Sequence, residues 1–306
     1  MKIDVHAHFV PPSCEDLIGG GRGPSNNMRD SMTDLDVRLA DMTDRGVDIE
    51  LVSTPTSLAS NDVATIRRLN DETAKAISAH PDRLIGLATV ALHEPEEAAR
   101  ELERCVKELG FKGAEIMTNV QGDNLHEAKF APFFRKMEEL DAAVFVHPNN
   151  VLGADRLGSF YLNNMIGNPT DTSVAAASLI FGGVLQEMPT LKFVLAHGGG
   201  TCPLLRGRWE HGWNSKLVDT PITRPPSEYF RYLYFDSLVH STPVLNYLVD
   251  TVGPERVMLG SDYPYGMGDP RPAASVAALP HASDADKQMM YSGNAIRVFG
   301  LDIDDA

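Results

Sequence analysis

The chain alternates between short runs of β-branched and other apolar residues and longer segments whose apolar residues recur at helical spacing. Runs of the first kind predict strands, because a strand of a parallel sheet is buried on both faces. Eight such runs occur, at residues 2–6, 49–53, 84–88, 113–117, 143–147, 192–197, 232–236 and 257–262. The pattern therefore predicts strands spread over the whole chain.

Segments with apolar residues three and four positions apart lie between and after these strands, and this spacing predicts helices. In one of them, Leu35, Leu39 and Met42 fall on the same helix face. In another, Glu96 and Glu97 occupy the first turn, where negative charge suits the helix dipole. The predicted helices cover residues 34–45, 62–79, 95–109, 128–140, 170–187, 203–213, 243–252 and 284–299.

Repeated strand–helix alternation favours a parallel sheet closed into a barrel, the (β/α)8 TIM-barrel fold of the α/β class. The competing fold, an open doubly wound sheet, usually has a glycine-rich phosphate loop after an early strand, and this sequence shows none there. No linker-like change of composition divides the chain, so we expect a single domain over residues 1–306.

Two irregular stretches interrupt the alternation, at about residues 10–33 and 149–169. Both follow strands that end in histidine. In a TIM barrel, the loops after the carboxyl ends of the strands build the active site. We therefore expect these stretches to form walls or lids of a pocket, with plain surface loops as the alternative.

Composition narrows the possible partners. Apolar residues make up 43% of the 306 residues and charged residues 23%, which is typical of a globular protein. The formal net charge of −15 disfavours binding to nucleic-acid phosphates. The longest apolar run, at 142–146, is far shorter than the roughly 20 residues of a membrane helix. The N-terminus lacks an apolar signal region, and three scattered cysteines argue against a disulfide framework, so we expect a cytoplasmic protein.

Metal-binding residue types end four of the predicted strands. The first strand leads into His6 and His8, whose side chains project to the same side and form a natural chelate for a transition metal. The fifth and sixth strands end in His147 and His197, and the eighth ends in Asp262. In a closed barrel these strands open onto the same mouth, so the side chains should converge as a catalytic metal site with an open coordination position.

The alternative is that His147 and His197 are hydrogen-bonded core residues and that Asp262 caps a loop. Four such strand ends in barrel order favour the metal site. Lys112 precedes the fourth strand rather than ending it, so a bridging lysine is missing and we expect one metal ion, not two. The remaining histidines are expected at the surface, apart from a possible pocket residue that follows the seventh strand, His240.

Four motifs resemble those of the amidohydrolase superfamily: H-x-H at 6–8, His-Pro at 147–148, His-Gly-Gly-Gly at 197–200 and Gly-Ser-Asp-Tyr-Pro at 260–264. Within it, the chain is most similar to the metal-dependent non-oxidative decarboxylases of aminocarboxymuconate semialdehyde, γ-resorcylate and other salicylate-type acids. The resemblance covers nearly the whole chain and implies the same barrel fold.

The resemblance also implies a role for each motif residue. His6, His8, His147 and Asp262 would bind one divalent metal ion, with Zn²⁺ expected first and Mn²⁺ as the alternative. Asp262 thereby belongs to the catalytic centre as well as to the ligand set. His197 would act beside the metal as the general acid or base.

Substrate contacts follow less directly from the resemblance. Arg208 matches an arginine that in a related enzyme reaches the substrate carboxylate of the neighbouring subunit, which implies a homodimer; a surface arginine is the alternative. Tyr263 and His240 are further candidates for contact with substrate. The family has a second substrate arginine after the first strand, where this chain has Arg22 and Arg29, and neither is assigned that role.

The activity implied is carboxy-lyase chemistry, the removal of CO₂ from an aromatic or unsaturated carboxylic acid. The metal would act as Lewis acid and template, and His197 would transfer the proton. The alternative is a hydrolase or hydratase that uses the same metal centre on a lactone, an amide or an enoic diacid. A metal-binding scaffold without catalysis is a third hypothesis.

Overall fold

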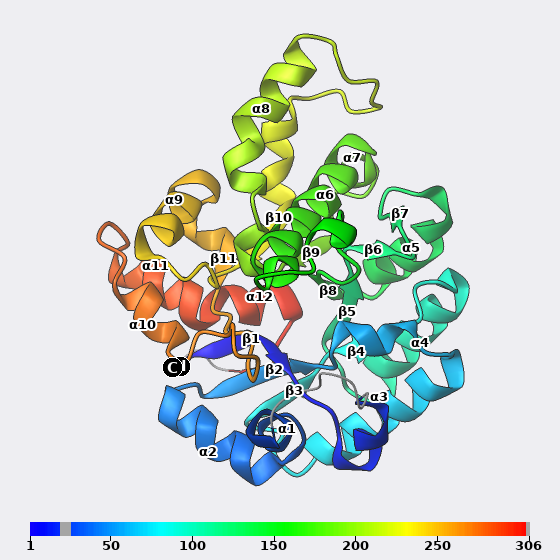
Figure 1. Cartoon of the computed structure of the whole chain (residues 1–306), viewed down its shortest axis with the longest axis vertical. Helices are drawn as coiled ribbons and strands as arrows, with labels where there is room; N and C mark the ends of the chain where they lie inside the picture. The colour runs from blue at the N-terminus through cyan, green and yellow to red at the C-terminus, as the bar shows by residue number, and fades with distance from the viewer. Residues whose placement is uncertain (19–25, 304–306) are drawn as a thin grey trace.

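In the computed structural model, nine strands among the described residues run parallel and surround a common interior (Figure 1). The structure describes residues 1–18 and 26–303. One sheet contains β1 (Ile3–His8), β2 (Ile49–Ser53) and β3 (Leu84–Gly86). The other contains β4 (Ala88–Thr89), β5 (Gly113–Met117), β8 (Ala143–His147), β9 (Lys192–Leu195), β10 (Leu233–Asp236) and β11 (Val257–Met258). A short antiparallel pair, β6 (Asn119–Val120) and β7 (Asp123–Asn124), lies apart from them.

Backbone hydrogen bonds close these two sheets into one barrel. β3 and β4 follow each other directly, and Leu87 between them donates its N–H to the carbonyl of Val52 at 2.9 Å. At the other junction, Val5 of β1 donates to the carbonyl of Leu259 at 2.9 Å. β1 therefore lies beside the segment that follows β11, and the predicted TIM-barrel fold is confirmed.

Helices cover the outside of the barrel (Figure 1). They are α1 (Asn26–Thr33), α2 (Leu35–Arg45), α3 (Val63–Ile77), α4 (Pro95–Lys107), α5 (Ala131–Glu139), α6 (Asn168–Phe181), α7 (Val184–Glu187), α8 (Cys202–Asn214), α9 (Thr242–Val252), α10 (Pro272–Ala277), α11 (Asp284–Gln288) and α12 (Asn294–Phe299). Short helical turns are η1 (Pro12–Leu17), η2 (Thr56–Ser60), η3 (Ala128–Phe130), η4 (Ala154–Arg156), η5 (Asn163–Gly167), η6 (His197–Gly199), η7 (Pro226–Tyr232), η8 (Pro254–Arg256) and η9 (Met289–Gly293). Among the described residues, no helix is both long enough and apolar enough to cross a bilayer.

Local signals explain several helix ends. Asp34 begins α2 because its carboxylate accepts hydrogen bonds from the N–H groups of Asp36 and Val37. The predicted helix 170–187 is divided into α6 and α7, because Gly183 adopts a φ of 83°, a conformation that glycine tolerates. The helix α1 lies inside the stretch predicted as irregular, and residues 19–25 of that stretch are outside the described part of the chain.

The predicted strands 192–197 and 257–262 extend too far at their carboxyl ends. β9 ends at Leu195 and β11 ends at Met258. His197 and Asp262 follow them in left-handed backbone conformations, with φ of 56° and 60°. Such a conformation ends a strand, because a strand needs extended backbone. These two residues therefore lie on turns at the mouth.

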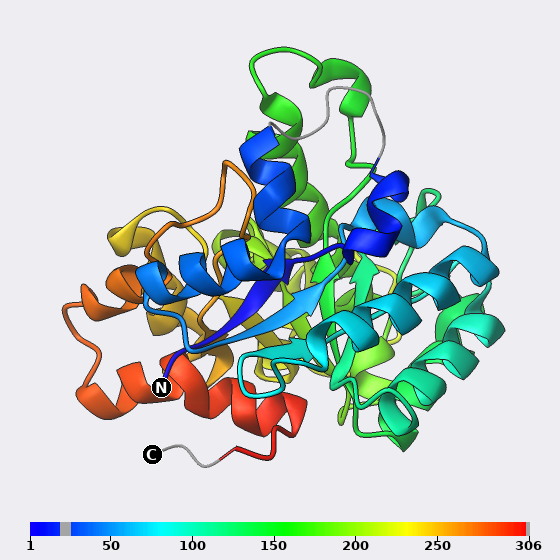
Figure 2. The ribbon, with the colours of Figure 1, turned by 90° about the horizontal axis from the view of Figure 1, so that it is seen from below.

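Apolar side chains fill the interior of the barrel, and polar side chains lie at the carboxyl ends of the strands. Residues such as Val5, Leu51 and Phe145 form a buried cluster inside the ring. A larger cluster packs between the strands and the surrounding helices. Figure 2 shows both termini on the side opposite to that toward which β1 points. The mouth carries α1 and the segment around η5 (Figure 2).

Candidate metal centre

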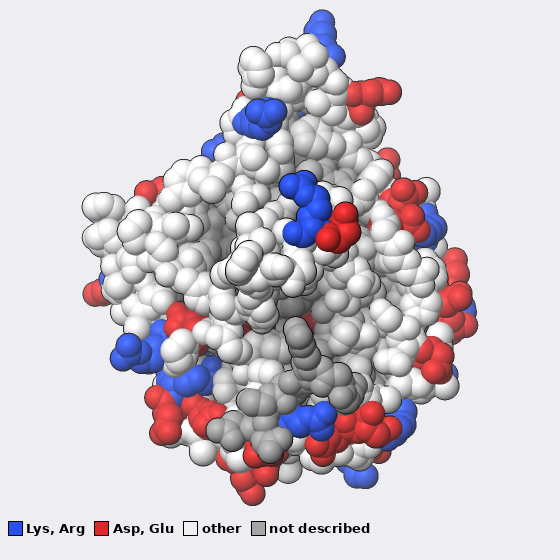
Figure 3. Space-filling view, in the orientation of Figure 1, with Lys and Arg blue, Asp and Glu red and all other residues white. Residues whose placement is uncertain are grey.

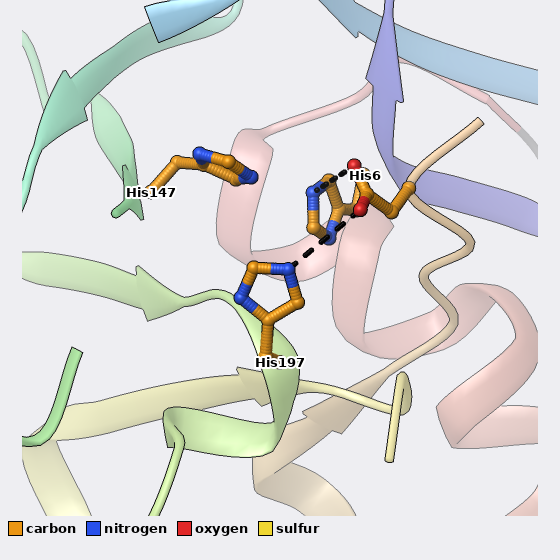
Figure 4. Close-up of side chains that lie close together, drawn as sticks. His6, His147 and His197 are labelled. Atoms are coloured by element: carbon orange, nitrogen blue, oxygen red, sulfur yellow. Dashed lines mark ion pairs between the residues drawn. The ribbon is translucent and has the colours of Figure 1, made fainter. Parts of the chain in front are cut away.

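Three histidines and one aspartate converge at the mouth of the barrel. One nitrogen or oxygen atom from each of His6, His147, His197 and Asp262 lies within 4.8 Å of all the others. They come from β1, from the end of β8, and from the turns after β9 and β11. Figure 4 shows the three imidazoles directed toward one another. His8 lies outside this group of four, but its Nε2 is 3.1 Å from Oδ1 of Asp262.

Asp262 is the centre of the cluster. Its Oδ1 lies 3.3 Å from Nε2 of His6, and its Oδ2 lies 3.7 Å from Nε2 of His197. Burial raises the pKa of Asp262, but His6 and the other imidazoles outweigh burial and hold that pKa well below its usual range. Asp262 therefore stays a carboxylate, the form that binds a metal ion.

His147 is held neutral with a free nitrogen. Its Nδ1 lies 3.1 Å from the carbonyl of Pro148, and a carbonyl only accepts, so Nδ1 is the donor. Burial, together with His8 and His6, lowers the pKa of His147 well below its usual range. The lone pair on Nε2 of His147 is therefore available to a metal ion.

His6 has the opposite charge state when no metal is bound. Its Nδ1 lies 2.7 Å from Oδ2 of Asp236, and its Nε2 faces Asp262. Burial lowers the pKa of His6, but these carboxylates outweigh burial and raise it to about 10. In the metal-free chain His6 is therefore protonated on both nitrogens, and its Nε2 faces Asp262.

The cluster leaves many buried polar atoms without a hydrogen bond. They are Nε2 of His6, Nδ1 and Nε2 of His8, Nε2 of His147, Nδ1 of His197 and Oδ1 of Asp262. An unsatisfied buried polar group typically costs about 1–3 kcal/mol, and one divalent cation would satisfy several of them together. Imidazole nitrogen and carboxylate oxygen are ligands that both zinc and manganese accept, so the donor set fits such an ion.

Asp236, at the end of β10, was not among the predicted site residues. Besides His6, its carboxylate accepts the N–H of His197 at 2.9 Å, of Gly198 at 2.7 Å and of Leu238 at 3.1 Å. It thus orients one imidazole and holds the turn that carries another. Its position could have identified it, because Asp236 is the last residue of the predicted seventh strand, just as the other site residues stand at the ends of their predicted strands.

The glycines after His197 allow the turn to approach α6 closely. Gly200 has a φ of 64°, and a Cβ atom there would lie 1.9 Å from the carbonyl oxygen of Pro169. Only glycine fits that position without displacing the backbone. The His-Gly-Gly-Gly motif therefore places His197 at the mouth.

A cavity of about 270 Å³ lies beside the cluster. Its polar lining residues are Asn164, Asn168, His197, His240 and Asp262, and its other lining residues are Met165, Pro169, Gly200, Leu238, Val239, Val244 and Met267. Figure 3 shows a hollow on this face with mostly uncharged side chains around it. Asn164, Met165, Asn168 and Pro169 belong to the irregular stretch 149–169, so that stretch lines the cavity.

The predicted substrate contacts separate into two groups. His240 lines the cavity. The hydroxyl of Tyr263 instead donates to Asp41 of α2 at 2.5 Å, and its ring packs 3.9 Å from the guanidinium of Arg45. Arg208 is exposed on α8, which projects from the barrel (Figure 1). Within a single chain, Tyr263 and Arg208 are not among the residues that line the cavity.

Among the described residues, Arg29 and the five histidines expected at the surface do not line the cavity. Arg29 is directed toward Glu15 and the carbonyl of Ile18, each at 3.4 Å. Arg22 lies outside the described residues. The five histidines expected at the surface are exposed or half-buried: His80, His93, His126, His211 and His281.

Related proteins of known activity match this chain over nearly its whole length. The Amidohydrolase family model matches residues 3–301. The chain is 34% identical to the 2-amino-3-carboxymuconate-6-semialdehyde decarboxylase of Dictyostelium discoideum, over 99% of this chain and 92% of that protein. It is 25% identical to a 2-keto-4-carboxy-3-hexenedioate hydratase of Sphingobium, over 98% of this chain and 96% of that protein. A crystal structure of 5-carboxyvanillate decarboxylase from Novosphingobium aromaticivorans, complexed with manganese and 4-hydroxy-3-methoxy-5-nitrobenzoic acid, superposes with a TM-score of 0.87 at 25% identity, covering 98% of this chain and 96% of that chain.

Proposed function

The chain belongs to the amidohydrolase family, and from this premise we propose that it is a metal-dependent, non-oxidative decarboxylase of an aromatic or unsaturated carboxylic acid. The observation that supports this proposal most directly is the set of unsatisfied nitrogen and oxygen atoms at the mouth, next to a cavity with mostly apolar walls. Such walls suit the flat hydrocarbon part of an aromatic acid, and the donor set suits one divalent cation.

His6, His8, His147 and Asp262 would hold the metal ion. The ion, Zn²⁺ by the sequence resemblance or Mn²⁺ as in the structural relative, supplies a Lewis acid and a template for the oxygens of the substrate. Asp236 holds the ring of His6 through Nδ1. The carbonyl of Pro148 does the same for His147.

His197 is the proton-transfer residue in this proposal. Its side chain is 14% exposed, compared with 5% for Asp262 and 0% for His6, and it lines the cavity. When the carbon–carbon bond to the carboxylate breaks, CO₂ leaves and the electron pair stays on the substrate carbon. His197 would deliver a proton to that carbon.

The remaining cavity residues would orient the substrate. His240 and the amides of Asn164 and Asn168 offer hydrogen bonds to its hydroxyl or carboxylate groups. Arg208 would reach the substrate only from a second copy of the chain, in a homodimer. Tyr263 contacts Asp41 and would act by supporting the turn next to Asp262.

The test is CO₂ release by metal-loaded protein from a panel of 2-hydroxybenzoates, dihydroxybenzoates, naphthoates and 2-amino-3-carboxymuconate semialdehyde. We expect release that stops after chelation and in His197→Ala with its metal retained. No release from protein shown to contain metal, together with turnover of a lactone or an enoic diacid, would overturn the proposal. A hydratase among the relatives makes that second panel worth including.

A further inference from the structure

The two histidines of β1 have similar surroundings at both ends of their rings. Nε2 of His6 and Nε2 of His8 both face Oδ1 of Asp262, at 3.3 and 3.1 Å. The opposite nitrogens point to other carboxylates: Nδ1 of His6 to Asp236 at 2.7 Å, and Nδ1 of His8 to Oε2 of Glu115 at 3.9 Å. Each ring thus lies between Asp262 and a second buried carboxyl group.

Glu115 is a buried residue without a role in the proposed reaction. Its side chain is 3% exposed, on β5. The hydroxyl of Ser53 donates to its Oε2 at 2.5 Å, and Ser53 is the residue of β2 that pairs with His8 in the sheet. The strand pairing of β1 with β2 therefore brings the anchor of Glu115 next to His8.

The gap of 3.9 Å separates Nδ1 of His8 from Oε2 of Glu115, the oxygen that also accepts from Ser53. Oε1 of Glu115 and Nδ1 of His8 are buried and make no hydrogen bond. The 3.9 Å distance exceeds an ordinary hydrogen bond by about 1 Å, which a small rotation of either side chain can cover. A bond from Nδ1 to either oxygen would satisfy a buried donor, and a bond to Oε1 would also satisfy a buried acceptor.

We propose that Glu115 is the positioning residue of His8: it accepts a hydrogen bond from Nδ1 and thereby leaves Nε2 free and directed at the metal ion. The inference rests on the metal centre of the proposed function. Glu115 is not itself placed as a ligand, because its Oε2 accepts from Ser53 and lies on the Nδ1 side of His8, whereas Nε2 of that ring faces Asp262. Removing the carboxylate behind a ligating histidine typically weakens metal binding by about 10–100-fold.

The experiment measures the Kd of Mn²⁺ by equilibrium dialysis, which needs no substrate. We expect Glu115→Leu to raise that Kd by about 10–100-fold. The matched control is Glu101→Leu, which also removes a buried carboxylate, one that is bonded to Arg104 and Asn70 between α3 and α4. That variant should lower stability and leave the Kd unchanged. A Kd for Glu115→Leu within twofold of the unsubstituted protein would overturn the inference.

A double-mutant cycle separates positioning from other effects of Glu115. If Glu115 acts through His8, adding Glu115→Leu to His8→Ala should change the Kd by less than twofold. An undiminished effect in that background would mean that Glu115 binds the metal or acts through its charge, and would overturn the inference. If Glu115→Leu does not fold, Glu115→Gln replaces it, with a Kd raised by about threefold or more because an amide oxygen is a weaker acceptor than a carboxylate; an unchanged Kd overturns the inference.

These outcomes are distinct from failure of the proposed function. Protein that binds Mn²⁺ but releases no CO₂ contradicts the decarboxylase and still tests Glu115. Protein that releases CO₂ and binds Mn²⁺ equally well with and without the Glu115 carboxylate contradicts the positioning role alone. Unsubstituted protein that binds no Mn²⁺ or Zn²⁺ overturns both.

Discussion

Two buried polar clusters next to β1 differ in how their charges are balanced. The metal cluster (His6, His8, His147, His197 and Asp262) contains several polar atoms without hydrogen bonds. The arginine–carboxylate network (Asp4, Arg38, Arg45, Glu50 and Ser261) contains two cations and two acidic groups in contact, and only Nε of each arginine lacks a hydrogen bond there. Arg38 bonds one oxygen of Glu50 at 2.5 Å, and Arg45 bonds the other.

The arginine–carboxylate network holds the backbone that carries the metal cluster. Asp4 accepts the N–H groups of His6 and Ser261, each at 3.0 Å, and so joins β1 to the turn before Asp262. Arg38 donates to the carbonyl of His8. This chain pairs buried carboxylates with its own arginines where they hold the backbone, and at the mouth it offers unpaired nitrogen and oxygen atoms that suit a bound cation.

The largest effect on stability should come from breaking the arginine–carboxylate network. Arg38→Met leaves Glu50 buried with half of its charge pairing removed, and this should lower the free energy of unfolding by about 3–5 kcal/mol. Urea denaturation of metal-free protein measures it. Arg100→Met, which removes an exposed partner of Glu97, is the control and should change stability by less than about 1 kcal/mol. Equal effects of the two variants would contradict the comparison.

Removing a ligand should impair the metal cluster with little loss of fold. Asp262→Ala or His6→Ala should weaken metal binding on the order of a hundredfold or more, because each removes one of few donors. Metal analysis after dialysis gives the occupancy, with the exposed histidine variant His211→Ala as control. Full occupancy in Asp262→Ala would show that the ligand assignment is wrong.

The metal cluster should also respond to pH through His6. Its pKa of about 10 in the metal-free chain means that a metal ion must displace a proton from this ring. Lowering the pH therefore weakens binding, and raising it from about 6.5 to 8.5 should strengthen binding by up to about tenfold per pH unit. Calorimetric titration in buffers of different ionisation enthalpy counts the released protons. An affinity independent of pH would contradict the charge state given to His6.

The smallest effect should come from Arg208, which tests whether the cavity uses a cation from a second copy. Arg208→Ala should raise KM by about tenfold or more with metal content unchanged, because a hydrogen bond to a charged group contributes about 1.5–3 kcal/mol and about 1.4 kcal/mol is tenfold. The exposed Arg231→Ala is the control. An unchanged KM, or a monomer by sedimentation at assay concentration, would make Arg208 a surface residue.

The sequence by itself determined most of the strands and helices and the convergence of His6, His147, His197 and Asp262. Strand runs that end in His147 or His197 predict convergence, because every carboxyl end of a parallel barrel opens at the same mouth. The ends of two strands were inaccurate, since the left-handed turns at His197 and Asp262 depend on contacts with distant segments. The predicted helix 170–187 is divided at Gly183, and α1 lies in a stretch predicted as irregular.

The tertiary structure alone decided what lies behind those residues. Glu115 meets Ser53 from 62 positions away, and Arg45 meets Ser261 from 216 positions away. Tyr263 immediately follows Asp262, yet its hydroxyl bonds to α2. Periodicity along one strand determines the face on which a side chain lies. The partner on that face depends on how far apart the strands and helices pack, and no local pattern of residues carries that distance.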